Sequence, residues 1–594
     1  MTTPSRAARA LALLAAATLL ILASSGGAAR AEDAPQPQGQ PQEQSPWFRE
    51  VARERGLPAE LFAHRCCFVD VDGDTWPDVM LANRRLFRNV PAPGGGRRFV
   101  EVPDALGIAP DAPTPALTLF ADLDQDGDQD ALVIWADDPS DPKRKAPAPR
   151  ARVHWQTGPL RFQPDLRPLP LEPEPVVAGG LFDRDHDGRL DLVLGSTYKA
   201  GGAELEAYPV RLLAGGPRGS FREVTREAGL ALRPEPGRLD SRRPIFGVAF
   251  ADLDGDGRAE VLLCAYGRQR NLLYLNQGDG TFREVGTETG FAGDQDESGT
   301  YSKEIKEMFR RRYGQERPDE LPFRANGNTF DAPAADVDND GRVDVFLGEI
   351  THAWAGPSSD RSSLLWNEGP PLRFRRDEAV CARQHVTPSW NQGDLFAGFA
   401  DVDNDGWQDL IVASGEYPDD NRARLFRQDR PGHFVDVTGP AGLAWDNCTA
   451  LSLADYDKDG DVDILVGNSN NRLPAERRQG RVLRPALFEN QVGSQRRWLN
   501  VRLVGAGAAR GGASPEAYGA RVTVWAGGRR YLREVVGARG HAGHVDAREA
   551  AFGLGAATKV DRLEVLWPSR ELRRTVLEDV PVDRCLVLRQ GEKE

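Results

Sequence analysis

The 594-residue chain has little cysteine and histidine, and its cysteines follow no ligand spacing. The six cysteines are Cys66, Cys67, Cys264, Cys381, Cys448 and Cys585. Because no C-x-x-C pair occurs, the sequence argues against zinc ribbons and thioredoxin-like redox sites. The scattered spacing is also not that of a disulfide framework. We therefore expect buried free thiols.

Long hydrophobic runs are also missing beyond the first residues of the chain. Arg6 and Arg9 precede an apolar stretch at residues 10–23, and Ala29-Arg30-Ala31 has the form of a cleavage site. The stretch is shorter than the ~20 residues that span a bilayer, so a secretory signal is favoured over a membrane anchor. No cysteine follows it, which argues against a lipoprotein. We expect a signal peptide at 1–31, a Pro/Gln-rich linker at 32–46 and a periplasmic or extracellular protein.

The chain has no excess of basic residues, since its formal net charge is −14. A nucleic-acid partner, whose phosphates require a basic face, is therefore disfavoured. The familiar strings of serine hydrolases and zinc proteases, G-x-S-x-G and H-E-x-x-H, are also missing. Composition thus indicates neither nucleic-acid binding nor a common hydrolase.

What the sequence does contain is one acidic nonapeptide repeated seven times, D-x-D-x-D-G-x-x-D, between apolar runs. Its acidic positions one, three, five and nine are Asp70, Asp72, Asp74 and Asp78; Asp122, Asp124, Asp126 and Asp130; Asp183, Asp185, Asp187 and Asp191; Asp252, Asp254, Asp256 and Glu260; Asp336, Asp338, Asp340 and Asp344; Asp401, Asp403, Asp405 and Asp409; Asp455, Asp457, Asp459 and Asp463. A motif that recurs in this way indicates an array of similar structural units.

Carboxylates at alternate positions form the oxygen cage that hard cations prefer. An EF-hand is excluded, because the twelfth positions are apolar where that motif has a ligating Glu. We predict ligands at positions one, three, five and nine with a carbonyl at seven, and up to seven Ca²⁺ ions. The alternative is an Asp/Gly-rich turn that binds nothing. The Asp70 site is expected to be the weakest, since Thr75 replaces the Gly of the other motifs.

Residues 246–285 define the repeating unit as four short strands with Gly-rich turns, which is typical of a propeller blade. A string like F-R-E-V ends most units and also precedes the first motif, at residues 48–51. It is missing after the seventh motif. The N-terminal copy is therefore predicted to complete the last blade, which closes the ring and removes its edges. The fold class is all-β, with a seven-bladed propeller at 47–493.

The array resembles the FG-GAP or VCBS repeats of integrin-α-like propellers, with Phe246-Gly247 at the FG position. That resemblance implies metals that brace the blade loops and are not catalytic. Residues 494–594 resemble the ASPIC/UnbV domain of the cartilage-acidic-protein-1-like family, through WLNVRLVG, YGARVTVWAGG, FGLG and VDRLEVLWPS. This part is expected to be a small β-rich domain. It departs from the family's pattern at residues 514–517 and at Arg570.

Long insertions fall mainly on the turns opposite the metal loops, at 137–151, 197–209, 293–327, 351–363 and 469–485. Because loops on a rigid scaffold commonly carry binding sites, that face is the candidate ligand surface. Its conspicuous side chains are Tyr301, His352, Trp354 and Trp390, and a helix is predicted at 302–313. The alternative is that these loops have no binding role. The string from His541 to Asp546 is interpreted as a polar loop between strands in preference to a metal or catalytic cluster.

We therefore predict an exported, calcium-stabilised binding or adhesion module for an extracytoplasmic protein or glycan. The alternative is a carbohydrate-active lyase or hydrolase on the same scaffold, for which acid pairs cannot be identified among 89 acidic residues. A structural component of a surface assembly is a third possibility, and the fold alone does not decide among them.

Overall fold

The computed structural model describes residues 46–592 except 137–149, 172–173, 200–206, 233–241, 317, 321–324, 385–389, 416–421, 471–472 and 474. The predicted signal peptide and most of the linker therefore lie outside the described residues, as does most of the 137–151 insertion. In the described part of the chain, no helix combines the length and apolar character needed to cross a membrane.

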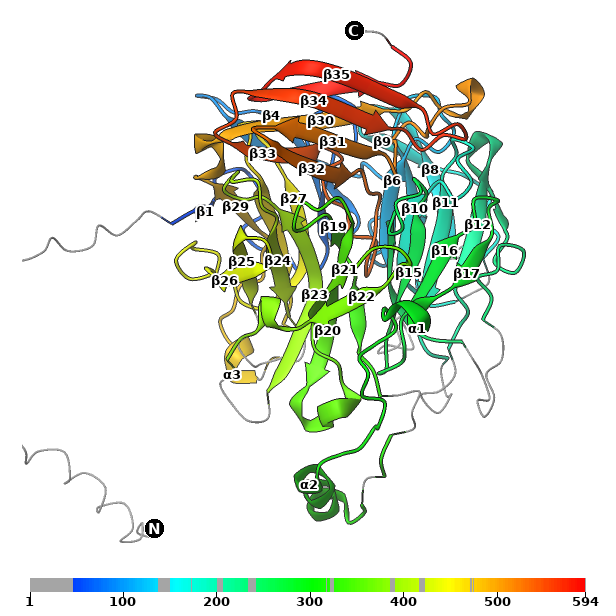
Figure 1. The fold of residues 1–594 in the computed structure, drawn as a ribbon, viewed down its shortest axis with the longest axis vertical. Coiled ribbons are helices and arrows are strands. Elements are labelled where there is room, and N and C mark those ends of the chain that lie inside the picture. The colour runs from blue at the N-terminus through cyan, green and yellow to red at the C-terminus, as the bar shows by residue number, and fades with distance from the viewer. Residues whose placement is uncertain are drawn as a thin grey trace, which may run out of the picture. The chain divides into compact units, whose positions relative to one another are not determined.

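Antiparallel four-stranded sheets make up most of the described chain (Figure 1). The first four are β2 (Cys66–Val69), β3 (Asp78–Leu81), β4 (Arg85–Pro91) and β5 (Arg97–Val102); β6 (Leu117–Ala121), β7 (Asp130–Ile134), β8 (Ala151–Gly158) and β9 (Arg161–Pro164); β10 (Val176–Phe182), β11 (Asp191–Ser196), β12 (Arg211–Gly216) and β13 (Ser220–Glu223); β14 (Ile245–Ala251), β15 (Glu260–Ala265), β16 (Leu272–Asn276) and β17 (Phe282–Glu284). Each acidic motif joins the first two strands of such a group.

A nine-stranded sheet contains two further groups, which a long strand joins. Its strands are β18 (Thr329–Asp331), β19 (Ala334–Ala335), β20 (Asp344–His352), β21 (Ser363–Asn367), β22 (Phe374–Asp377), β23 (Asn391–Ala400), β24 (Asp409–Ser414), β25 (Ala423–Arg430) and β26 (His433–Asp436). The end of β20 pairs with β23 through Ile350 and Gly393. The motifs at Asp336 and Asp401 connect β19 to β20 and β23 to β24.

The ring closes through the N-terminal strand, as the sequence predicts. β27 (Cys448–Ala454), β28 (Asp463–Asn468) and β29 (Ala486–Asn490) form a sheet that β1 (Phe48–Glu50) completes. β1 and β29 are antiparallel, with Phe48 opposite Asn490 and Glu50 opposite Phe488. Joining the first and last strands removes two exposed sheet edges.

The C-terminal strands form two smaller sheets at one end of the ring (Figure 1). One contains β30 (Arg497–Val504), β33 (Ala550–Gly555) and β36 (Arg584–Arg589); the other contains β31 (Arg521–Ala526), β32 (Arg529–Glu534), β34 (Lys559–Leu566) and β35 (Arg574–Pro581). Leu119 of β6, Leu192 of β11 and Val522 of β31 belong to one continuous buried cluster. The all-β propeller with a C-terminal β-rich domain is thus confirmed.

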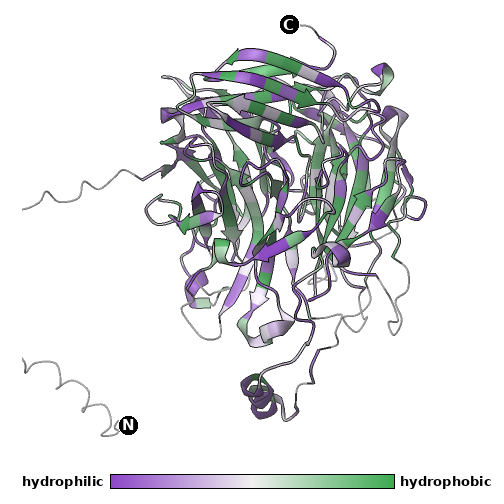
Figure 2. Cartoon of the chain, viewed as in Figure 1, coloured by the Kyte–Doolittle hydropathy of each residue, from purple (hydrophilic) through white to green (hydrophobic). Residues whose placement is uncertain are grey.

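Helices are short, and one of them stands apart from the sheets. Beside α1 (Gly286–Thr289) and α3 (Ala475–Arg478), α2 spans Lys303–Tyr313, with Ser302 as its N-cap and left-handed Gly314 at its end. It has no buried residue and is strongly hydrophilic, whereas the strands are largely apolar (Figure 2). α2 lies at the end of the ring away from the C-terminal sheets (Figure 1).

All six cysteines lie within the described residues and are free. Five are buried as expected, whereas Cys585 is exposed. The expectation of burial is therefore wrong for Cys585, because it lies on β36, an edge strand of its sheet.

Candidate metal centres

The acid at position nine holds each motif closed. In the fifth motif, Asp344 Oδ2 accepts the Val337 amide at 3.2 Å and Asp344 Oδ1 accepts the Asn367 amide of the third strand at 2.8 Å. The same pair of backbone bonds occurs at Asp78, Asp130, Asp191, Glu260, Asp409 and Asp463. Each bonded oxygen retains a lone pair for a cation.

The carboxylate at position one of each motif accepts a backbone hydrogen bond from position six and so closes the loop. The Gly341 amide donates to Asp336 Oδ2 at 3.0 Å, and the Arg342 amide donates to Asp340 Oδ1 at 2.8 Å. The amide at position six points inward because that residue adopts a left-handed conformation, with φ of 89° at Gly341. These local bonds gather the carboxylates without any contact from a distant element.

Ligand oxygens from three acids lie within 4.8 Å of one another in several loops. The groups include Asp70, Asp72 and Asp78; Asp122, Asp124 and Asp130; Asp183, Asp185 and Asp191; Asp252, Asp254 and Glu260; Asp336, Asp338 and Asp340. Position nine joins positions one and three in the first four groups, whereas position five does so in the Asp336 group, and these clusters could hold metal ions. Position five is absent from four of these groups, and its Oδ1 accepts the amide at position seven in all five loops.

The oxygens fit a hard divalent cation. Asp70, Asp336 and Asp455 each leave Oδ1 buried and without a hydrogen-bond partner. Desolvation, reinforced by neighbouring carboxylates, raises the pKa of Asp78, Asp344 and Asp401 to about 8. An all-oxygen donor set favours Ca²⁺ over Zn²⁺ or copper. A bound cation would compensate charges that otherwise repel one another.

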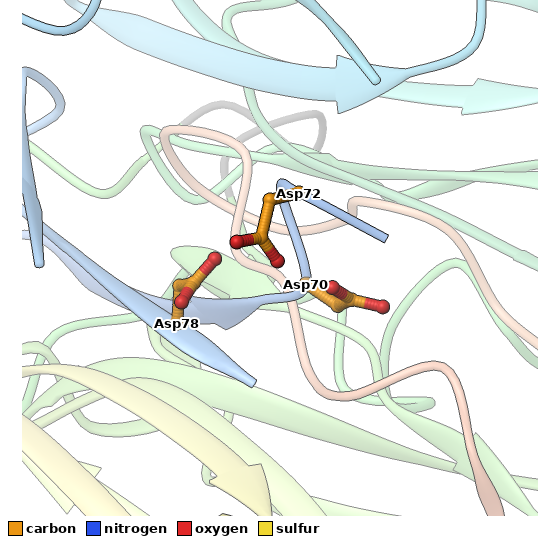
Figure 3. A group of neighbouring side chains, drawn as sticks. All are labelled: Asp70, Asp72 and Asp78. Atoms are coloured by element: carbon orange, nitrogen blue, oxygen red, sulfur yellow. The ribbon is translucent and has the colours of Figure 1, made fainter. Parts of the chain in front are cut away.

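The Asp70 loop differs from the others, as its sequence suggests. Figure 3 shows Asp72 and Asp78 directed toward each other, with Asp70 at the start of the loop. Thr75 takes the left-handed conformation, with φ of 71°, that Gly occupies elsewhere. Arg502 Nη2 lies 2.5 Å from Asp70 Oδ2, and Arg88 Nη2 lies 2.6 Å from Asp72 Oδ2. That this site binds metal most weakly stays a prediction, which these two arginines favour.

A belt of side-chain amides links neighbouring motifs, and the sequence analysis missed it. An Asn or Gln on the third strand of six groups donates to the carbonyl at position two of the preceding motif. The pairs are Asn89 and Tyr456, Gln156 and Val71, Asn276 and Arg184, Asn367 and Leu253, Gln428 and Val337, Asn490 and Val402. Gly215 occupies the equivalent strand position in the third group. A recurring amide in strings such as LFRN, LLWN and LFEN was the available signal.

The C-terminal domain covers the motif face of the ring. Asn500 Nδ2 donates to Asp455 Oδ2 at 2.8 Å, Arg521 pairs with Asp252, and the Asp122 amide donates to Glu516 at 2.7 Å. The Gly555 amide donates to the Asn404 carbonyl at 2.9 Å. A cavity of about 180 Å³ lies at this boundary, lined by residues that include Asp336, Asp401, Arg533 and Arg539. Sequence reasoning had no signal for this coverage, because the partners lie 45 to 394 residues apart in separate domains.

The string from His541 to Asp546 belongs to a loop, residues 536–547, that enters the centre of the ring; we call it the channel loop. Arg539 Nη1 contacts both oxygens of Asp331 at 2.7 and 2.8 Å. His541 stacks on Phe246 with centroids 5.6 Å apart. The Ala547 amide donates to Leu453 of β27 at 3.0 Å. The string lies in a loop between β32 and β33, as interpreted from the sequence, and the innermost strands surround this loop.

The four residues predicted for the ligand face lie near the opposite end of the ring, around blade strand β20. Trp354 stacks with Tyr301 and His352 at centroid distances of 6.2 and 5.3 Å. Arg361 lies over Trp390 at 5.2 Å. Tyr301 is 2% exposed and forms the buried end of the stack, whereas the other three side chains are half-buried.

The fold and the motif loops define a class of protein: an FG-GAP-type β-propeller followed by an ASPIC/UnbV domain. A model described as FG-GAP-like repeat matches residues 183–263, 252–301 and 401–466, and one described as ASPIC and UnbV matches residues 511–594. These matches confirm the resemblance inferred from the sequence.

Curated relatives point to the cartilage-acidic-protein-1-like family. Cartilage acidic protein 1 of Xenopus tropicalis is 24% identical over 343 residues, which cover 56% of this chain and 43% of the relative. Cartilage acidic protein 1 of Mus musculus is 24% identical over 367 residues, which cover 59% of this chain and 45% of the relative. The match thus spans less than half of each relative's length. A Bacillus licheniformis rhamnogalacturonan lyase structure is 12% identical, covers 75% of this chain and 76% of its own, and has a TM-score of 0.34, which supports no conclusion.

Proposed function

We propose that this chain is an exported, calcium-stabilised binding or adhesion module whose ligand is an extracytoplasmic protein or glycan. The observation that carries the proposal is the coverage of the motif face. The C-terminal domain and its channel loop occupy that face, so the acidic loops serve as struts rather than as a docking surface. The opposite end of the ring, with its insertions, is the side left for a ligand.

The chemistry of that end suits an acidic ligand. α2 carries Arg310, Arg311 and Arg312 in its last turn and has no buried residue. The stacked Trp354 and His352 lie half-buried in the same region of the chain as Arg361 and Trp390. Aromatic faces and guanidinium groups together recognise sugar rings that bear carboxylates or sulfates. Net charge elsewhere is strongly negative, so the basic helix is a local feature.

The test is a glycan and matrix-protein array probed with the chain lacking residues 1–31, combined with a polysaccharide-degradation screen. We expect a ligand whose binding falls at least about tenfold in the W354A and R310A/R311A/R312A variants. R562A, on the covered side, serves as the matched control and should bind normally. Turnover of a polysaccharide, or binding that ignores both variants, would contradict the proposal.

A further inference from the structure

Two buried carboxylates at the far end of β20 have donors for only half of their oxygens. Glu349 is 0% exposed and Asp360 is 3% exposed. Glu349 Oε1 accepts Thr329 Oγ1 at 2.6 Å, and Asp360 Oδ2 accepts the Asp294 amide at 3.0 Å. Glu349 Oε2 and Asp360 Oδ1 are buried without a hydrogen-bond partner. Such orphaned oxygens require an explanation, because buried polar atoms are normally paired.

A third carboxylate approaches the pair from the 293–327 insertion. Asp294 starts the string D-Q-D-E-S-G at residues 294–299, which repeats the first six positions of the metal motifs with Ser298 at position five. The Asp296 amide donates to Asp294 Oδ1 at 2.7 Å, and Gly299 has φ of 62°. Asp294 is half-buried, whereas Asp296 is exposed. Asp294 lies beside the buried pair, since its backbone amide contacts Asp360 and its charge adds to the rise in the pKa of Asp360 that burial causes.

The two ends of the insertion close tightly around these oxygens. A side chain at Gly293 would lie 2.1 Å from Asn326 Oδ1 and 3.2 Å from Asp360 Oδ2. A side chain at Gly327 would lie 2.3 Å from Glu349 Oε2. The first residue of the insertion thus lies beside Asp360, and the last lies beside Glu349. Whatever satisfies those carboxylates also holds the base of the insertion.

Among the described residues, carboxylates outnumber cations at this place. Arg376 is the nearby cation, and its attraction opposes the rise in the pKa of Glu349 and Asp360 that burial causes. Its Nη1 is committed to Ser363 Oγ at 2.7 Å. One guanidinium thus faces three carboxylates, and burial raises the pKa of Glu349 and Asp360 when no further cation is present. An unpaired buried charge destabilises the folded state, and a bound divalent cation would remove that destabilisation.

We propose that Glu349, Asp360 and Asp294 bind one hard divalent cation of the Ca²⁺ class, at the end of the ring opposite the seven motif loops. The ion clamps the base of the 293–327 insertion, which carries α2, onto β20. The site is separate from the motif loops in sequence and in position. It does not depend on the identity of any ligand of the proposed binding face.

The direct test is crystallography of the wild-type protein with Tb³⁺ or Mn²⁺ in place of Ca²⁺. We expect an anomalous peak about 2.3–2.6 Å from Glu349 Oε2 and Asp360 Oδ1. The proposal is overturned if those oxygens share a water bridge to Arg376, or a proton, in crystals whose motif loops are occupied. Because no substitution is needed, this result does not depend on the folding of a variant.

Solution measurements give an independent test. By calorimetric titration with Ca²⁺, E349Q/D360N should bind one ion fewer than wild type, while D296N, in the same string but exposed, should bind the same number. Trypsin should cleave after Arg310–Arg312 faster in E349Q/D360N than in D296N. An unchanged ion count in E349Q/D360N would overturn the cation site. Loss of glycan or protein binding with the ion count intact would instead implicate the proposed function.

Discussion

At the residue scale, the buried amides of the third strands connect blade to blade. Asn367 is 3% exposed; its Nδ2 donates to Leu253 O at 2.8 Å and Val343 O at 3.1 Å, and its Oδ1 accepts the Gly369 amide. One side chain thus satisfies two carbonyls, one from the preceding motif and one from its own. Asn367 thus links the carbonyl at position two of one motif to the carbonyl at position eight of the next.

We predict that Asn367→Leu destabilises the protein by about 2–4 kcal/mol, because it leaves two buried carbonyls and one amide unpaired. Denaturant unfolding followed by tryptophan fluorescence measures the change. Gln163→Leu, at an exposed position on β9, is the matched control and should change the free energy of unfolding by less than about 0.5 kcal/mol. Equal effects of the two substitutions on the free energy of unfolding would contradict a stabilising role for the belt of side-chain amides.

At the element scale, the channel loop joins the C-terminal domain to the innermost strands. Arg539 is 5% exposed and reaches Asp331 of β18, the Ala397 carbonyl of β23 and Asp546 of its own loop. Asp331 Oδ2 also accepts the Ala397 amide at 3.1 Å. This ion pair is buried on both sides, so removing one partner leaves an uncompensated charge.

We expect Arg539→Met to destabilise the docked domain by about 3–5 kcal/mol, which is typical of breaking a buried pair. Thermal unfolding should show the loss, and the domain junction near residue 495 should become more sensitive to protease. Asp331→Asn combined with Arg539→Met should recover part of the stability, because the Asp331 charge is then removed as well, while Asp546 keeps its contact with His544. Arg562→Met, which removes an exposed pair with Glu564, should have an effect below about 1 kcal/mol. Protection of the junction in Arg539→Met would contradict the docking role.

At the scale of the whole molecule, the acidic loops are distributed around the ring, one between the first two strands of each group. We predict that EDTA lowers the melting temperature by at least about 10 °C relative to millimolar Ca²⁺, because each filled site contributes about 2.7 kcal/mol at one hundred times its Kd. Differential scanning calorimetry measures the shift. Mg²⁺ is expected to restore less than Ca²⁺ does. An EDTA-treated protein with the same melting temperature as the Ca²⁺-loaded protein would contradict the calcium assignment.

The pH dependence of the EDTA-treated protein should have a definite sign. Burial raises the pKa of Asp78, Asp344 and Asp401 to about 8, whereas the carboxyls of an unfolded chain titrate near ~3.9. The folded state therefore binds more protons between these values, and the free energy of unfolding falls as pH rises from about 4 to about 8. With Ca²⁺ bound, stability should instead be maintained toward pH 8, since the ion replaces the protons. Melting curves at pH 5 and pH 8, with and without EDTA, test both signs.

The motif loops and the ring closure could be predicted from sequence, because the interactions that form them are local or repeated. Asp336 and Gly341 are five residues apart, and their spacing alone places amide and carboxylate together. The F-R-E-V string at residues 48–51 identified the closing strand, since its duplicate was missing at the other end. The helix predicted at 302–313 is observed as α2, with Ser302 and Gly314 at its ends.

The tertiary structure alone decided what lies on each face of the ring. Arg502 meets Asp70, Arg521 meets Asp252 and Arg539 meets Asp331 across separations of 208 to 432 residues. No spacing rule connects such partners, because their proximity depends on how a separate domain docks. For the same reason Asp294 and Asp360, 66 residues apart, could not be related before the fold was known. Local interactions between residues close in sequence determined the metal-motif loops. Long-range packing of the C-terminal domain determined which face of the ring is covered.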